Sequence, residues 1–232
     1  MTAPTLSTPP RRRRRWVRRV LIGLAVLVVL LLAGTAAAVK LQPVPDPLAL
    51  PAAAAAPTGA SDGTWAVGPG SLAGFRIRQV VIGLSSDVVG RTTGLTGTAT
   101  VTGDKVTGAD VQVDLRALTS GDKPAPSFTK GLDTDRYPTA TLRLNGPIPL
   151  GPGFATGAVT TASATVQLTL HGVSRPVTVP LQARRSGDAV QVSGRFPVSF
   201  ADHRITSPGG IPFLGDLDDH GVAEFLLVLH RA

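Results

Sequence analysis

The 232-residue sequence has no cysteine, one methionine and few aromatic residues: seven Phe, two Trp and one Tyr. Without cysteine the chain forms no disulfide and carries no lipid-modified cysteine as a membrane anchor. The scarcity of aromatic side chains leaves most apolar positions to Val, Leu and Ala, with many Thr and Gly between them. Small aliphatic side chains that face the inside of a closed sheet leave room for an elongated apolar ligand.

The net charge of the chain is confined to its N-terminal region. The net charge of +8 lies entirely in residues 1–40, which contain seven Arg, Lys40 and no acidic residue. The rest of the chain has as many acidic as basic residues, so the folded part is near neutral. A basic cluster is typical of nucleic-acid binding, but this one adjoins a long apolar run. We therefore expect no nucleic-acid partner.

The apolar run covers residues 20–39 and contains no charged residue. A helix of this length rises ~1.5 Å per residue, or about 30 Å, which is the thickness of a bilayer's hydrocarbon core. Basic residues precede the run and only Lys40 follows it closely. The positive-inside rule then places residues 1–19 in the cytoplasm as a basic tail, and the chain after the span outside it. The sequence predicts a single-pass transmembrane helix with an extracytoplasmic domain in the cell envelope.

A cleaved signal peptide is the alternative interpretation, because Ala36, Ala37 and Ala38 offer a cleavage site near Ala38 that would release a secreted protein. We favour the uncleaved anchor, since the apolar run spans fully and the basic region before it is long. The following residues 40–62 are rich in Pro and Ala. Proline blocks helices and strand ladders alike, so we expect a semi-rigid linker that holds the domain off the membrane.

Residues 63–232 have the pattern of β-strands and predict one all-β domain of about 170 residues. In one stretch apolar and polar residues alternate on both sides of a turn at Gly172, which gives each strand one apolar face. Positions expected to be buried there are Val166, Leu168, Leu170, Val177, Val179 and Leu181, with Thr169 and Thr178 facing outward. Regularly spaced strands without a long amphipathic helix indicate an antiparallel barrel or sandwich. The expected strands are residues 63–67 continuing to 75–78, 94–102, 106–115, 139–145, 160–170, 174–183, 189–200 and 223–231.

Two stretches interrupt this pattern. Residues 80–89 contain glycine and a Ser-Ser-Asp sequence, and we expect a turn-rich bridge there. Residues 118–135 predict one or two helical turns with Ser127 as the N-cap. Phe128 and Leu132 are four residues apart, so they can pack together as a plug over one end of a barrel.

No motif for catalysis or metal binding stands out. The histidines lack metal-ligand spacing, and no nucleophile elbow, P-loop or dinucleotide-binding glycine pattern occurs. The acidic segment GDLDDHG, residues 215–221, does not match a calcium loop and is interpreted as a solvated loop. Asp202, His203 and Arg204 are interpreted as neighbours on a strand, which point to opposite faces. We expect no enzymatic activity, no cofactor and no bound metal.

The hairpin sequence LTLHGVSRPV, residues 168–177, is similar to the most recognisable signature of the YceI-like family. Other segments resemble the family in the same order: WAVGPGSLAGFRIR (65–78), VVGRTTGLTGTATV (88–101) and DRYPTATL (135–142). The resemblance covers about residue 63 to the C-terminus. It implies an extended, antiparallel, lipocalin-like β-barrel, here preceded by one transmembrane helix and the Pro/Ala-rich linker.

The resemblance also implies a lumen that binds polyisoprenoid or similar amphiphilic chains. Many relatives carry His where this chain has Gln79, so a role of that histidine does not transfer to this chain. The expected function is a membrane-anchored binding protein that holds an isoprenoid, quinone-like or other lipid chain. Candidate lumen residues are Phe75, Ile77, Val113, Leu115, Leu142, Leu144, Leu168 and Leu170, with Phe128, Leu132 and Tyr137 at the mouth. The alternative is a structural or protein-interaction module of the cell envelope, whose barrel its own side chains fill; cavity volume distinguishes the two.

Overall fold

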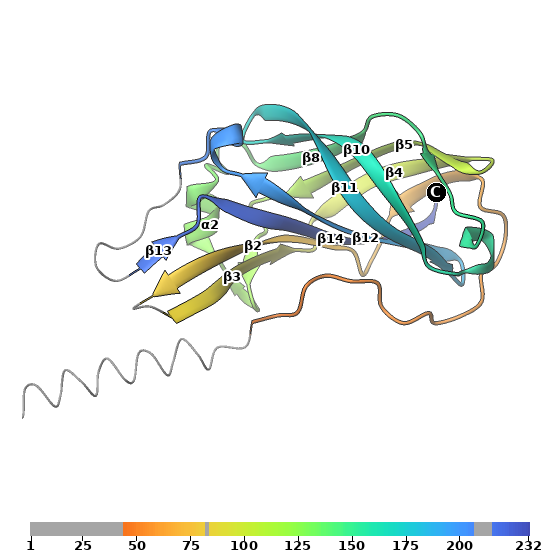
Figure 1. Cartoon of the computed structure of the whole chain (residues 1–232), viewed down its shortest axis with the longest axis horizontal. Helices are drawn as coiled ribbons and strands as arrows, with labels where there is room; N and C mark the ends of the chain where they lie inside the picture. Colours follow the sequence, from red (N-terminus) through yellow and green to blue (C-terminus); the bar gives the residue numbers. More distant parts are fainter. Residues whose placement is uncertain (1–43, 82–83, 207–214) are drawn as a thin grey trace, which may run out of the picture. The chain divides into compact units, whose positions relative to one another are not determined.

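The computed structural model describes residues 44–81, 84–206 and 215–232, which are almost entirely β-structure (Figure 1). The strands are β1 (Gly63–Val67), β2 (Leu72–Val81), β3 (Leu84–Thr92), β4 (Leu95–Thr102), β5 (Lys105–Asp114), β6 (Thr119–Ser120), β7 (Lys123–Pro124), β8 (Thr139–Leu144), β9 (Ile148–Pro149), β10 (Thr160–Leu170), β11 (Val173–Ser186), β12 (Ala189–Ser199), β13 (Gly215–Leu217) and β14 (His220–Arg231). The helical elements are α2 (Pro126–Gly131) and the 3-10 turns η1 (Phe154–Thr156) and η2 (Ala201–His203).

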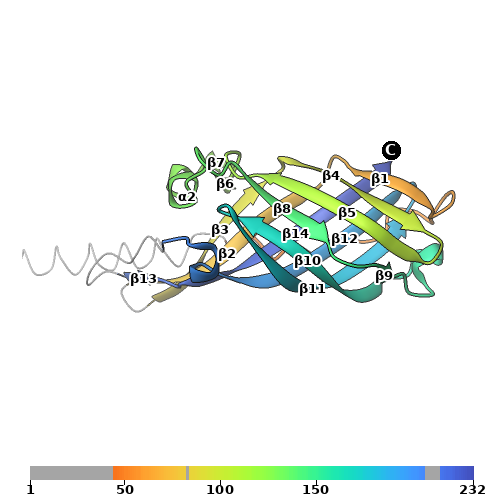
Figure 2. The ribbon, with the colours of Figure 1, turned by 90° about the horizontal axis from the view of Figure 1, so that it is seen from above.

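These strands form an antiparallel barrel (Figure 2). The ring runs β1, β4, β5, β8, β10, β11, β12 and β14, and closes where Val67 of β1 pairs with Leu229 of β14. Toward its other end β14 pairs with β2, and β2 pairs with β3. The expected all-β antiparallel barrel is therefore confirmed. The predicted transmembrane segment, residues 20–39, lies outside the described residues; among those described, no helix is long and apolar enough to cross a membrane.

The hairpin of β10 and β11 has the expected alternation. Its turn is His171-Gly172, with φ values of 51° and 72°, which is the backbone conformation that a two-residue hairpin requires. Leu168 and Val179 are buried, and Thr178 is exposed. The other apolar positions, Val166, Leu170, Val177 and Leu181, are half-buried, and all of them except Val177 border a cavity. The expected outward position of Thr169 fits its hydrogen bond to the exposed hydroxyl of Ser174.

Two local predictions were wrong. Residues 84–92 form strand β3, which pairs with β2 over its whole length, rather than a turn-rich bridge. Pairing with a neighbouring strand outweighs the weak local strand preference of Ser and Asp. Helix α2 begins at Pro126 and its N-cap residue, Ala125, makes no side-chain cap, so Ser127 lies inside the first turn. A proline is favoured at the first helical position because its missing N–H has no helical partner there.

Residues 44–62, here called the strap, have no regular secondary structure before β1 begins at Gly63. They lie along the outer wall of the barrel, held by hydrogen bonds to β2, β3, β11 and β14. Figure 1 shows the strap in orange, running beneath the barrel from the side of β2 and β3 toward the end that carries η1. This part of the expected linker is docked against the domain rather than extended away from it.

Candidate ligand-binding site

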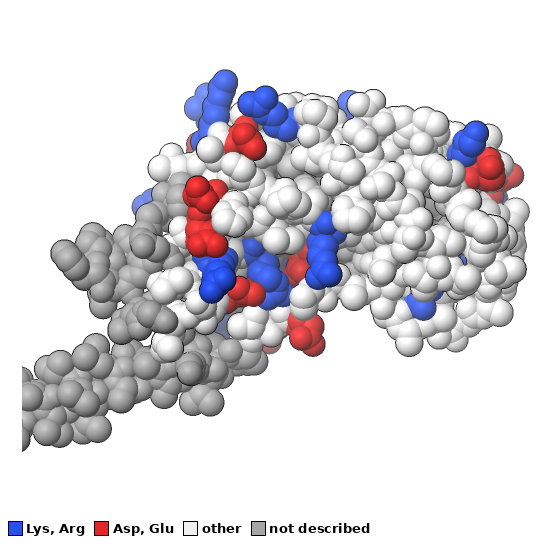
Figure 3. All heavy atoms as spheres, viewed as in Figure 1, with Lys and Arg blue, Asp and Glu red and all other residues white. Residues whose placement is uncertain are grey.

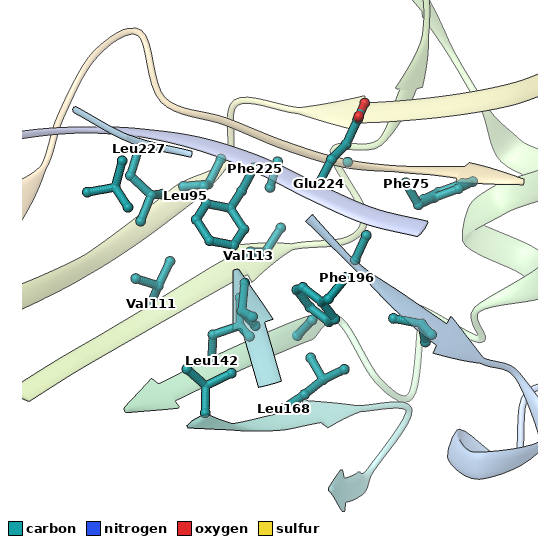
Figure 4. A pocket seen from close by; sticks show the side chains of 18 of the residues that line it. Phe75, Leu95, Val111, Val113, Leu142, Leu168, Phe196, Glu224, Phe225 and Leu227 are labelled. Carbon is teal, nitrogen blue, oxygen red and sulfur yellow. The ribbon is translucent and has the colours of Figure 1, made fainter. Parts of the chain in front are cut away.

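An elongated cavity of about 520 Å³ lies inside the barrel. Its lining extends from Ile148 and Phe154 beside η1 to Phe128 of α2 and Gln79 of β2. The lining side chains are apolar except for a few uncharged ones: Gln79, Thr92, Ser127 and Thr160. Glu224 also borders the cavity, but its side chain points to the other side of β14 (Figure 4). Among the described residues, therefore, no charged side chain reaches into the cavity.

The cavity is closed at the η1 end. Trp65, Phe154 and Ile148 line it there, and only 2%, 3% and 8% of their surfaces are exposed. The indole N–H of Trp65 donates a hydrogen bond to the carbonyl oxygen of Ser61, at 2.9 Å. A buried indole N–H needs such a partner, so this bond allows the ring to seal the end of the barrel.

The opposite end, beside α2, is the mouth of the cavity. Apolar residues that line it there, including Ile77, Phe128 and Leu132, are only half-buried. The rings of Phe75 and Phe128 meet edge to face, with centroids 5.0 Å apart. Gly90 lies directly beneath Phe75, since a Cβ there would be 2.5 Å from the ring. Phe128 and Leu132, the residues of the expected plug, both line the cavity at this end.

Bulky and small residues alternate along the middle of the cavity. Phe196 and Phe225 point into it (Figure 4). Phe225 packs over Gly194 of β12, where a Cβ would lie 2.6 Å from its ring. All described phenylalanines line the cavity: Phe75, Phe128, Phe154, Phe196, Phe200 and Phe225. The described phenylalanines thus shape the lumen, and small aliphatic residues supply the space between them.

Ten of the predicted ligand-binding residues line the cavity. They are Phe75, Ile77, Val113, Leu115, Phe128, Leu132, Leu142, Leu144, Leu168 and Leu170. Tyr137 does not line it. Its ring packs against that of His171 at an interplanar angle of 55°, with centroids 4.4 Å apart, and the guanidinium of Arg136 lies 5.2 Å from the centre of the tyrosine ring. A Cβ on Gly172 would be 2.7 Å from Tyr137, so this tyrosine supports the hairpin turn.

Sequence reasoning missed much of the lining. Further cavity residues come from β4, β12 and β14, among them Leu95, Val101, Val192, Phe196, Phe225 and Leu227. These strands have the same alternation as the predicted ones, and that signal is sufficient to find them. Alternation alone does not tell a cavity wall from a filled core, because both are apolar.

The interpretation of residues 215–221 as a solvated loop was wrong for most of the segment. Gly215–Leu217 form strand β13, which pairs with β2, and His220 begins β14, so only Asp218 and Asp219 lie between the two strands. His220 contacts Asp219 at 2.9 Å and Asp218 at 3.9 Å. The hydrogen bond to Asp219 raises the pKa of His220, and the same bond lowers the pKa of Asp219. The side chain of Asp216 lies outside the described residues. Within the described part of the chain, no cluster of His, Asp or Glu has the arrangement of a metal site.

His203 is not on a strand, contrary to the prediction for Asp202, His203 and Arg204. It ends turn η2 and is 2% exposed. Its Nδ1 donates to the carbonyl oxygen of Val173, and Nδ1 of His171 bonds the carbonyl oxygen of His203. The register pairs β11 with β12 only from Leu181 onward. These two histidines therefore bridge the splayed strands near the mouth and have a structural role.

The closed antiparallel ring and its apolar interior define a lipocalin-like barrel. The model of the YceI-like domain matches residues 65–222. The chain belongs to the YceI-like family. No curated protein sequence matches it.

Three solved structures are similar in fold. A polyisoprenoid binding domain from Saccharophagus degradans, implicated in plant cell wall breakdown, has 16% identity and a TM-score of 0.57, covering 74% of this chain and 100% of its own. BcnA of Burkholderia cenocepacia has 20% identity and a TM-score of 0.51, covering 66% and 95%. The YCEI protein of Campylobacter jejuni has 13% identity and a TM-score of 0.50, covering 62% and 84%. At these identities the likeness shows the barrel fold alone.

Proposed function

We propose that the barrel binds the apolar chain of an isoprenoid, quinone-like or other lipid in its lumen. The observation that carries this proposal is the cavity of about 520 Å³ with an apolar, uncharged lining. Its volume lies in the range of known small-molecule sites, ~300–1,000 Å³. Each CH₂ group that leaves water for such a lining contributes on the order of 0.8 kcal/mol. The polyisoprenoid binding domain among the similar structures supports the same ligand class.

The proposed role is binding rather than catalysis. The polar side chains that reach the cavity are uncharged amide and hydroxyl groups, Gln79, Thr92, Ser127 and Thr160. Such groups hydrogen-bond a neutral polar head, but at neutral pH they do not exchange protons as a general acid or base does. Gln79 lies at the mouth, where its amide donates to the hydroxyl of Ser86 at 3.0 Å.

The proposed location is the outer side of a cell membrane, with residues 20–39 as an uncleaved anchor. The uncharged run and the basic residues before it support this placement. A reporter fused after Ala232 should be active outside the cytoplasm, and neutral replacements of the seven arginines before the span should scramble that orientation. Activity only inside the cytoplasm would contradict the placement. An intact mass that begins after Ala38 would instead show a cleaved, secreted form.

Native mass spectrometry tests the binding proposal directly. The full chain, purified in mild detergent from the membranes of its host, should release a lipid on collisional activation. Leu142→Trp places a larger side chain in the cavity and should remove that lipid. Tyr137→Trp is the matched control, because Tyr137 packs against His171 outside the cavity and its variant should retain the lipid. Wild-type protein without lipid would favour the protein-interaction module instead.

A further inference from the structure

The strap contacts the most buried carboxylate on the outer wall of the barrel. The Glu224 side chain is 1% exposed, although it faces away from the lumen. Arg91 lies 3.4 Å and Arg76 3.9 Å from its Oε1. The backbone N–H of Leu48 in the strap donates to Oε2 at 3.2 Å. The strap is therefore a hydrogen-bonding partner of a buried ion cluster.

Both arginines of this cluster also bind the strap. Arg76 donates to the carbonyl oxygen of Pro45 at 2.7 Å, and Arg91 donates to that of Asp46. Buried charges are costly unless they are paired and hydrogen-bonded. The strap backbone supplies three of these bonds and is therefore held where the cluster lies, although the buried Nε atoms of Arg76 and Arg91 have no hydrogen-bond partner among the described residues.

A glycine in β2 makes the cluster possible. Glu224, Gly74 and Arg91 lie in one row across β14, β2 and β3. A Cβ on Gly74 would be 3.0 Å from the side chain of Arg91 and 2.2 Å from a backbone oxygen of β3. Without a side chain at Gly74, Arg91 can cross β2 and reach Glu224.

A second anchor holds the strap at the closed end of the barrel. Arg185, which is 4% exposed, donates to the carbonyl oxygens of Thr58 and Gly59. The backbone N–H of Ala54 donates to the hydroxyl of Ser186 at 3.0 Å. The N–H of Thr58 also bonds the carbonyl oxygen of Gly187, in the turn between β11 and β12. The strap is thus fixed at both ends of its path along the wall.

The two anchors determine where the preceding chain leaves the barrel. Strand β1 begins at the closed end, where Trp65 pairs with Arg231. The first strap residues instead lie against Arg76, whose neighbours in β2, Phe75 and Ile77, line the mouth half of the cavity. The strap therefore moves the exit of the N-terminal chain from the closed end to the mouth half (Figure 1).

We propose that the strap turns the mouth of the barrel toward the lipid bilayer, so that a lipid chain passes between the bilayer and the lumen. This inference rests on the proposed membrane anchor and lipid binding. Residues 40–43 alone separate the predicted span from Val44, and at ~3.3–3.6 Å per residue they bridge less than about 20 Å. A mouth held this close to the surface shortens the path that an apolar chain takes through water.

The face in Figure 3 has no charge of a single sign that would explain such an orientation. On the face in Figure 3, Lys and Arg lie among Asp and Glu over the half that carries α2, β2 and β3. Arg76 pairs with Asp87 there, at 3.1 Å. Attraction to anionic lipids needs a field of one sign, such as a polybasic cluster. The mixed charges on this face supply no such field, whereas the docked strap fixes where the preceding chain leaves the barrel.

Fluorescence energy transfer tests the proposal. The full chain carries a donor dye and is reconstituted into vesicles in which a fraction of the lipid head groups carry an acceptor dye. The chain has no cysteine, so single cysteines can be labelled selectively. Lys130→Cys reports on exposed α2 at the mouth, and Asp104→Cys on the exposed turn at the closed end. We expect transfer at least two-fold more efficient from the label at residue 130. Equal transfer, or more efficient transfer from residue 104, would overturn the proposal.

Matched insertions show whether the strap causes the orientation. A flexible Gly/Ser insert of about 20 residues reaches ~25 Å on average. Placed between Pro43 and Val44, it should abolish the difference between the two labels. The same insert between Asp62 and Gly63 should preserve it, since the strap stays docked and still leads to the mouth. A preserved difference in the first insertion variant would contradict a role for the strap.

Lipid content, measured on the same samples, separates this proposal from the proposed function. If the protein contains lipid but both labels transfer energy equally, the proposed orientation is wrong and the proposed lipid binding still holds. Protein that washes off the vesicles would overturn the membrane anchor and this inference with it. A mouth that faces the bilayer in a protein without lipid would support the orientation but contradict lipid binding.

Discussion

Phe225 and Glu224 are neighbours on β14, and both are buried, but for opposite reasons. Phe225 points into the lumen, where it packs over Gly194 among apolar side chains. Glu224 points to the outer wall, where two arginines and the strap cover it. One strand thus separates an interior that no charged side chain of the described residues reaches from an outer wall with a buried ion cluster. The apolar side chains inside the barrel surround a cavity, whereas the buried charges on this wall fix one chain segment in one place.

The difference follows from the forces on each side. Apolar burial is non-directional, so a lumen lined by small aliphatic groups tolerates a ligand or a shifted ring. Charge-assisted hydrogen bonds are directional and costly to leave unmade, so the outer cluster accepts only a backbone that meets its geometry. We therefore expect substitutions on the outer wall to cost more stability than comparable ones in the lumen.

The largest effect is expected for Glu224→Ala. The substitution leaves Arg76 and Arg91 without their carboxylate and releases the N–H of Leu48. Breaking a buried pair in this way costs about 3–5 kcal/mol of unfolding free energy, which denaturant unfolding of the full chain in detergent measures.

Asp110→Ala provides the matched control for this prediction. Asp110 pairs with Arg143 at 2.6 Å on the surface, where their side chains are 46% and 73% exposed. Removal of an exposed pair costs about 0–1 kcal/mol. Similar losses in the two variants would show that the covered wall is no different from the open surface.

A pair of glycine substitutions compares the two sides of the sheet. Gly74→Ala, on the outer wall, puts a Cβ 2.2 Å from a backbone oxygen, which cannot move without disrupting β3. Gly194→Ala, facing the lumen, puts a Cβ 2.6 Å from the ring of Phe225, which can shift into the cavity. Overpacking costs typically 1–3 kcal/mol, and we expect about 3 for Gly74→Ala and about 1 for Gly194→Ala. Denaturation midpoints in the reverse order would indicate a rigid, filled lumen.

The smallest effect is expected at the exposed His220–Asp219 pair. The hydrogen bond to Asp219 raises the pKa of His220 above 6.5. A raised pKa in the folded state stabilises the protein below pH 6.5, and this contribution is lost as the pH rises through the raised value. NMR titration of the His220 ring should show the shift, and Asp219→Asn should lower the pKa toward 6.5. Because both groups are exposed, high salt should weaken the shift; an unchanged pKa in Asp219→Asn would contradict this assignment.

Much of the fold was predictable from the sequence, because one physical signal governs it. Alternation of apolar and polar residues identifies the strands and their inward faces, as for Leu168 and Val179. Strand β3 was missed because its Ser-Ser-Asp sequence lacks that alternation and depends on pairing with β2. Tyr137 was misplaced because its contact with His171 joins residues far apart in the chain.

The docking of the strap was not predictable from the sequence. Pro45, Asp46 and Leu48 contact the barrel through backbone carbonyl and N–H groups, which side-chain patterns do not reveal. Glu224 occupies an outward position of β14, where a charged residue is ordinarily exposed. Only the structure shows that this glutamate and the strap cover one another.

Leu168→Trp tests the central claim that the lumen holds an apolar ligand rather than a filled core. Leu168 is 4% exposed and lines the cavity. Lipid content and unfolding free energy are measured together on the full chain. The account predicts that the variant loses its extractable lipid and changes in stability by less than about 1 kcal/mol, because the ring enters space that the ligand otherwise occupies. Two results together would contradict the claim: a wild-type protein without lipid, and a variant that loses roughly 1–3 kcal/mol of unfolding free energy. A loss of that size is what overpacking of a filled core produces.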